Sequence, residues 1–152
     1  MKFTSTLQKF SFIILLATIS SCALKAIPSE YNNSRLTNID NSTLGNGKIL
    51  IYNGADILHG IDNTARLNIW IGDKSIGQIR IKEYTIIELE KGKYEFNVLH
   101  IDMVNMRSKH QIEIDENTKI IRIEPTITSN KLKITNTLPD NFAKYTNTLD
   151  RK

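Results

Sequence analysis

Isoleucine dominates the sequence after Gly47, and this feature restricts the fold more than any other. Residues 47–152 contain 19 Ile and only three Ala, which favours strands because β-branched side chains fit a pleated sheet. Many of these apolar residues recur at every second position, so one face of each predicted strand points into a core. The alternating sets are Ile49 and Ile51; Leu67, Ile69 and Ile71; Ile79 and Ile81; Ile87 and Leu89; Tyr94, Phe96 and Val98; Ile112 and Ile114; Ile121 and Ile123; and Leu132 and Ile134.

Short polar segments separate these strands and predict their connections. Residues 72–75 (GDKS), 90–93 (EKGK) and 115–117 (DEN) each lie between two alternating segments. We expect three consecutive hairpins there, with Pro125 closing the last strand of the third and KLKIT forming a final strand. Short strands separated by turns at this spacing indicate an all-β sandwich or barrel.

The two segments that flank the predicted domain differ from it in composition. Residues 23–46 contain five Asn with several Ser and Thr and have no apolar periodicity. They predict a flexible, solvated tether with an r.m.s. reach of roughly 25–30 Å, which would hold the domain clear of lipid headgroups. After residue 137, Pro139 stands at a suitable start for one short helix within 138–152.

The first 21 residues are typical of a secretory signal peptide. Lys2 and Lys9 precede the apolar run of residues 10–19, FSFIILLATI. Ten helical residues span about 15 Å, half of a ~30 Å hydrocarbon core, so this run is too short for an ordinary membrane span. Small residues follow the run, as they do at signal-peptide cleavage sites.

The sequence Ile19-Ser20-Ser21-Cys22 resembles the lipobox of bacterial lipoproteins. The resemblance implies that Cys22, the only cysteine in the chain, receives a diacylglycerol in thioether linkage and becomes the first residue of the mature protein. Two acyl chains are enough for stable anchoring. The alternative is an ordinary signal peptide cut after Ala23, which would remove Cys22.

Residues 47–137 resemble a second family as well. Gly72-Asp73-Lys74, Ile76-Gly77, Tyr84 and Gly92 follow the pattern of the PEGA domain and of a related domain of unknown function common in bacterial lipoproteins. Lys91 stands where the pattern has Pro, and Tyr94 where it has His. The resemblance implies an immunoglobulin-like or transthyretin-like β-sandwich of about 7–8 strands, and it supplies no catalytic residue.

Motifs for enzymatic chemistry or metal binding are missing from the sequence. None of His59, His100 and His110 lies at a metal-ligand spacing from another His or from Cys22. Ser108, His110 and Asp102 supply the residue types of a catalytic triad, but no nucleophile elbow surrounds the serine, so the sequence does not predict one. Without residues 1–21 the chain has 18 Lys and Arg against 16 Asp and Glu. This balance, with no basic cluster, argues against nucleic-acid binding.

Two features keep a binding role open. The 53–67 segment is too long for a tight turn, so it is either a binding loop or a crossover between sheets. Trp70 lies on the face opposite Leu67, Ile69 and Ile71. It is therefore an exposed candidate binding residue, unless both faces of its strand are covered.

These observations lead us to expect a lipid-anchored, non-catalytic interaction module of the bacterial cell envelope, without metal or cofactor. Ala23 after the cysteine favours the outer membrane, with the domain facing the periplasm, because similar lipoproteins kept at the inner membrane carry Asp there. The expected partners are the bilayer, through acylated Cys22, and another envelope protein or the cell-wall glycan. The alternatives are an envelope hydrolase that uses the 53–67 loop and a histidine, and a purely structural spacer or sensor stalk.

Overall fold

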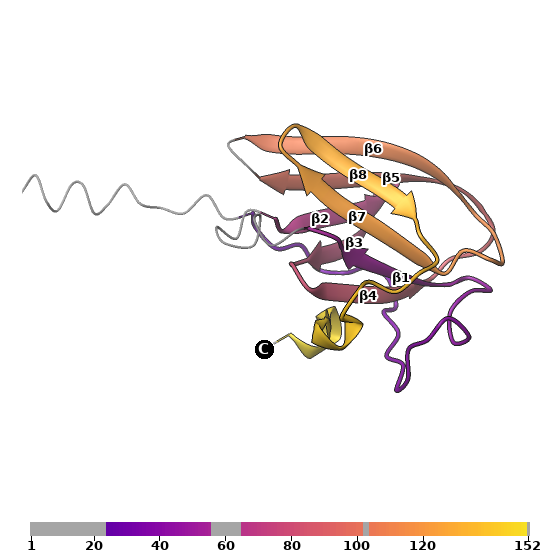
Figure 1. The fold of residues 1–152 in the computed structure, drawn as a ribbon. Helices are drawn as coiled ribbons and strands as arrows, with labels where there is room; N and C mark the ends of the chain where they lie inside the picture. Colours follow the sequence, from indigo (N-terminus) through magenta and orange to yellow (C-terminus); the bar gives the residue numbers. More distant parts are fainter. Residues whose placement is uncertain (1–23, 56–64, 102–103, 152) are drawn as a thin grey trace, which may run out of the picture.

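The computed structural model of the protein describes residues 24–55, 65–101 and 104–151, which form two packed β-sheets (Figure 1). The five-stranded sheet has the order β8-β7-β1-β4-β9, and the four-stranded sheet has the order β3-β2-β5-β6. The strands are β1 (Lys48–Asn53), β2 (Leu67–Ile71), β3 (Lys74–Ile79), β4 (Glu83–Glu88), β5 (Gly92–Ile101), β6 (Asn105–Ile114), β7 (Ile120–Thr126), β8 (Ser129–Ile134) and β9 (Thr146–Asn147). The prediction of an all-β sandwich is confirmed.

The core lies between the sheets and contains most of the side chains that the alternation selects, together with Ile76. Two selected residues lie outside it, since Ile81 is half-buried in the turn after β3 and Ile134 is exposed. Each buried Ile or Leu contributes about 1.5–3 kcal/mol to folding through removal of its apolar surface from water. Phe96 of β5 is fully buried and is the largest of these side chains. The core side chains are Ile49, Ile51, Leu67, Ile69, Ile71, Ile76, Ile79, Ile87, Leu89, Phe96, Val98, Ile114, Ile121 and Ile123.

The prediction of three consecutive hairpins is correct only at residues 72–75, where β2 and β3 pair. The connections at 90–93 and 115–117 cross from one sheet to the other, because β4 and β7 pair with β1 whereas β5 and β6 pair with each other. The other hairpins of the structure are β5–β6 and β7–β8. A turn sequence indicates where the chain reverses. The sheet that the next strand joins is decided by the packing of its apolar face.

Pro125 also differs from its predicted position. It lies inside β7, opposite Asn130 of β8, and the strand continues to Thr126. The parallel pairing of β7 with β1 ends at Asn53↔Ile123. Pro125 therefore lies beyond this ladder, where a residue without an N–H is tolerated.

The N-terminal segment, residues 24–46, lies against the sandwich instead of forming the expected solvated tether. Buried amides hold its first residues, since Gln78 Nε2 donates to Leu24 O (3.1 Å) and Asn68 Nδ2 donates to Lys25 O (2.8 Å). Glu30 N then donates to Ser75 O (2.9 Å) on the edge strand β3. The segment covers this edge, which would otherwise expose unpaired backbone groups. Polar composition did not reveal this role because backbone carbonyls make most of the contacts.

The C-terminal segment, residues 135–151, contains two 3-10 turns in place of the expected short helix. They are η2 (Phe142–Lys144) and η3 (Thr148–Asp150), and β9 between them pairs in parallel with β4. Asn141 has a left-handed backbone with φ 56°, which does not continue a helix. Pairing with β4 then draws Thr146 and Asn147 into an extended conformation.

Candidate interaction face

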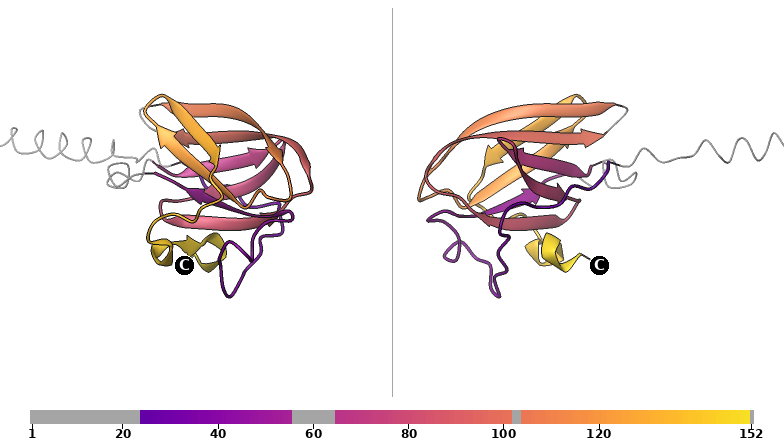
Figure 2. Two further views of the ribbon diagram at one scale, coloured as in Figure 1. Left: turned by 45° about the vertical axis from the view of Figure 1, so that its right-hand side comes forward. Right: turned by 180° about the vertical axis from the view of Figure 1, so that it is seen from behind.

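The outer faces of the two sheets are covered to different extents. On the five-stranded sheet, Leu50, Tyr52, Ile86 and Ile120 are buried beneath apolar side chains from both terminal segments. These covering side chains are Leu36, Ile39, Leu138, Phe142 and Tyr145. On the four-stranded sheet, the N-terminal segment reaches β3 and part of β2. Figure 2 shows that the terminal segments leave the β5–β6 hairpin clear.

We name the outward residues of this uncovered region the open face. Strands β5 and β6 contain ten residues each, and their antiparallel register places the outward side chains in directly opposed pairs. These pairs are Lys93↔Glu113, Glu95↔Gln111, Asn97↔Lys109 and Leu99↔Arg107. Trp70 of β2 lies beside Asn97 and completes the open face.

Glu95 is the acceptor for two neighbouring side chains of the open face. Lys109 Nζ lies 2.9 Å from Glu95 Oε1, and Asn97 Nδ2 donates to the same oxygen at 3.4 Å. The hydrogen bond from Lys109 lowers the pKa of Glu95 below its usual value, so this carboxylate is ionised at neutral pH. The Lys109 side chain is 67% exposed, so the pair adds little stability and its charges are accessible to a partner.

Trp70, the predicted candidate binding residue, is half-buried, a state between the two alternatives that the sequence left open. It points outward from β2, and the Arg107 guanidinium lies over its ring at 5.5 Å from the ring centroid. Such a contact is attractive because the cation meets the negative face of the ring. Tryptophan and arginine are the residue types most enriched at the energetic centres of protein interfaces.

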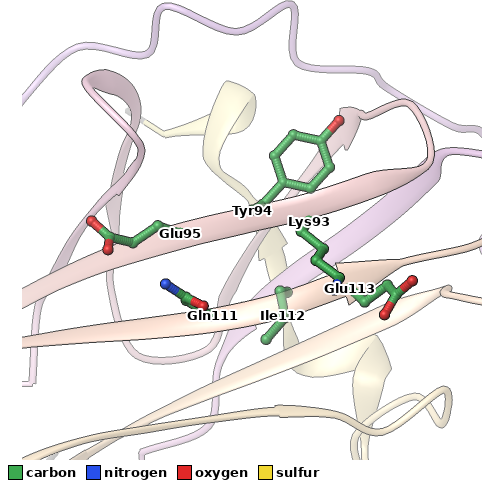
Figure 3. Close-up of a pocket in the computed structure, with 6 residues that line it drawn as sticks. All are labelled: Lys93, Tyr94, Glu95, Gln111, Ile112 and Glu113. Atoms are coloured by element: carbon green, nitrogen blue, oxygen red, sulfur yellow. The ribbon is translucent and has the colours of Figure 1, made fainter.

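A hollow of about 430 Å³ lies on the β5–β6 hairpin, near the end where β5 begins. Its lining residues are Lys93, Tyr94, Glu95, Gln111, Ile112 and Glu113 (Figure 3). In Figure 3 the Glu95 and Gln111 side chains extend side by side from neighbouring strands, while Tyr94 points away from them. Four of the six side chains are charged or carry an amide. This lining suits a polar peptide segment better than a small apolar ligand.

Two of the three histidines take part in a polar chain between β5, β6 and β8. His100 Nδ1 lies 2.8 Å from Asn130 Oδ1, Asn130 Nδ2 donates to Ser108 Oγ at 3.0 Å, and Ser108 Oγ lies 2.9 Å from His110 Nε2. Burial lowers the pKa of His110 below its usual value. Sequence reasoning missed Asn130, which is 3% exposed, because a single Asn in an edge strand carries no distinguishing pattern.

The Ser108–His110 distance is compatible with a nucleophile and its base. The rest of the arrangement differs from a catalytic triad. Asn130 Nδ2 donates a hydrogen bond to Ser108 Oγ. This bond engages a lone pair of the oxygen and so makes Ser108 a weaker nucleophile. In residues 24–55, 65–101 and 104–151, no carboxylate orients the ring of His110. The polar chain instead satisfies buried groups where the sandwich closes between β6 and β8.

Several predicted features lie outside the described residues: Cys22 and the signal peptide, Asp102, and most of the 53–67 segment, with His59. Across the described part of the chain, no three His, Cys, Asp or Glu side chains come together as metal ligands would. The same part contains no helix that is long and apolar enough to cross a membrane.

Comparison with known proteins found no matching family model, no matching curated protein and no matching solved structure.

Proposed function

We propose that the protein is a lipoprotein of the bacterial cell envelope whose β-sandwich is a non-catalytic interaction module. The open face is the proposed binding surface. The observation that carries this proposal is the contrast between the two sheets. Both terminal segments cover the outer face of the five-stranded sheet, while the β5–β6 side chains of the other sheet are left to solvent or to a partner.

A second protein is the partner that fits the open face best. Ten-residue strands extend about 33 Å, which suits a protein contact better than a small molecule. Trp70 beneath Arg107 provides a central aromatic and cationic anchor, and Glu95 with Lys109 provides charges at the rim. The cell-wall glycan remains the second candidate from the sequence, since the hollow presents amide and carboxylate groups to sugar hydroxyls.

The proposed membrane location rests on the first residues of the chain. The lipobox resemblance at Cys22 supports acylation, and Ala23 after it supports the outer membrane. The domain then faces the periplasm, where its partner is an envelope protein.

The proposal is tested by photo-crosslinking in intact cells. A photoreactive amino acid replaces Lys109 on the open face or Lys133 on β8, an exposed position on the covered sheet. We expect a discrete adduct from position 109 that disappears when Trp70→Ala is added, and none from position 133. Equal adducts from both positions, or no adduct from position 109, would contradict a specific open face. Ser108→Ala should leave the adduct unchanged, because the proposed role does not use this hydroxyl.

A further inference from the structure

The attachment of the N-terminal segment fixes how far the sandwich can lie from a lipid on Cys22. This inference rests on the proposed acylation of that residue. Leu24 is 9% exposed, and its carbonyl is bound by the buried amide of Gln78. Two residues of chain span at most about 7 Å, so a lipid on Cys22 would be tethered within a short distance of Leu24. The membrane surface must therefore lie close to the end of the sandwich where Leu24 is held.

The strand register identifies this end. Gln78 pairs with Asn68, which holds Lys25 and is opposite Leu99 of β5. Leu99 lies only two residues before Ile101, where the β5–β6 hairpin turns. In Figures 1 and 2 the described chain begins, in indigo, at the end where the β5–β6 hairpin and the β7–β8 hairpin turn. Asn130 of β8 contacts Met106 O at 3.4 Å, which places the two turns side by side.

Each of these two turns exposes a β-branched apolar side chain. Val104 in the β5–β6 turn is 60% exposed, and Ile127 in the β7–β8 turn is 73% exposed, the highest values among the large hydrophobic residues of the described chain. Ile127 occupies a two-residue hairpin turn, where Gly, Asn and Asp are usual. Neither side chain is part of the two buried clusters, so both apolar surfaces are available for a contact outside the domain.

Basic residues surround the same end. Arg66 directly precedes β2 and Arg80 directly follows β3, and the pair Leu67↔Ile79 between them brings both to this end. Lys25 is exposed there, whereas Arg66 and Arg80 are half-buried, each with a buried Nε. The nearby Glu83 is paired with Arg151. Cations in these positions would face lipid phosphates while the apolar turns enter the interface.

We infer that this end of the sandwich docks on the bilayer, with Val104 and Ile127 in the interfacial layer and the long axis of β5 and β6 directed away from the membrane. The opposite end, at Gly92↔Ile114, then lies about 30 Å from the lipid. The open face runs along the side of the molecule and remains accessible to a partner. Docking thus orients the module as well as holding it.

The test uses the full lipoprotein, purified from membranes and reconstituted in vesicles of phosphatidylethanolamine and phosphatidylglycerol that contain a nitroxide-labelled lipid. An acylated Cys22 has no free thiol and does not react with thiol reagents. A fluorophore can therefore be attached to a single introduced cysteine. Thr128→Cys labels the docking end beside Ile127, and Asn117→Cys is the matched control in the exposed turn at the opposite end. We expect the lipid nitroxide to quench the label at 128 and not the label at 117. Adding Ile127→Asp should lower the ratio of docked to undocked molecules about tenfold or more.

The outcomes separate this inference from the proposed function. Intact mass of the same sample reports whether Cys22 is acylated. If it is not, the anchoring proposal itself fails. If it is acylated and the label at 128 is not quenched, or both labels are quenched equally, end-on docking is refuted while anchoring stands. Self-quenching between labelled copies without lipid quenching would assign the turns to a protein contact and also refute docking. Ile127 is mostly exposed, so Ile127→Asp should keep the melting temperature of the parent, which shows that it is folded.

Discussion

Arg151 joins the C-terminal segment to the sandwich, and its replacement is expected to destabilise the fold substantially. Its guanidinium donates to both carboxylate oxygens of Glu83, with Nε at 3.1 Å from Oε1, and Nη2 donates to Gln78 O at 2.7 Å. The two charged side chains are only 24% and 12% exposed. The perturbation is Arg151→Met, which keeps most of the aliphatic packing and removes the charge and its hydrogen bonds.

The magnitude follows from the burial of the pair. Removing one partner of a buried ion pair costs about 3–5 kcal/mol, and exposed pairs contribute about 0.2–1 kcal/mol. Glu83 keeps one donor after the substitution, because Arg80 N donates to Oε2 at 2.8 Å. We therefore expect Arg151→Met to lower the free energy of unfolding by about 2–3 kcal/mol. The matched control is Arg35–Asp150, an exposed ion pair between the N-terminal and C-terminal segments at 2.5 Å with side chains 62% and 48% exposed, for which Arg35→Met should cost less than about 1 kcal/mol.

The assay is urea unfolding followed by the fluorescence of Trp70, the only tryptophan of the chain. Double-mutant cycles with Glu83→Gln and with Asp150→Asn give the coupling energy of each pair. Raising the salt concentration to about 1 M should remove the coupling of the exposed pair and preserve most of the coupling of the buried one. A coupling for Arg151–Glu83 that is no larger than that of the control, or that disappears in salt, would refute the reasoning.

Two further predictions concern pH and backbone geometry. Burial lowers the pKa of His110 below 6.5, so at mildly acidic pH the unfolded chain binds more protons than the folded chain. The free energy of unfolding therefore decreases as the pH falls below about 6.5. His110→Gln should flatten the fall in unfolding free energy from about pH 7.5 to 5, and an unchanged slope in urea titrations would contradict this. Gly47→Ala places a Cβ 2.6 Å from Leu89 O at φ +87°, whereas Gly72→Ala meets nothing within 4 Å at φ +57°. The first should cost at least about 2 kcal/mol and the second about 1 kcal/mol, and equal losses would show that the Leu89 contact is not limiting.

The fold class can be predicted from the sequence because a strand that buries one face must carry apolar residues at alternate positions. Ile49 and Ile51, or Leu67 and Ile69, occupy core positions since a strand turns every second side chain to one face. Strand pairing does not follow in this way. The turns at 90–93 and 115–117 have ordinary hairpin composition, yet long-range packing sends β5 and β7 to different sheets from their predecessors.

The packing of the two terminal segments on the sandwich could not be predicted either, because it also depends on long-range contacts. Residues 24–30 attach to Asn68, Ser75 and Gln78 mostly through backbone groups, apart from the Glu30 carboxylate, which accepts from Ser75 N at 2.6 Å. Backbone contacts of this kind do not depend on the side-chain composition of the segment. Leu138, Phe142 and Tyr145 lie at irregular spacings, so their joint burial on the five-stranded sheet has no period to detect.

The candidate site was predictable in part. Alternation places Trp70 on the outer face, and the structure adds Arg107 over its ring. The charged pairs of the open face could not be anticipated, because they depend on the β5–β6 register and sequence reasoning joined β5 to β4 instead. The joint exposure of Val104 and Ile127 likewise arises only when two hairpins of different sheets meet at one end.

The most direct test of lipid anchoring is the intact mass of the protein extracted from cell membranes. The account predicts a chain that begins at Cys22 and carries the added mass of a diacylglyceryl group, removable together with the N-terminal peptide after proteolysis. A chain that retains Met1, or one that begins at Leu24 with no added mass, would contradict it.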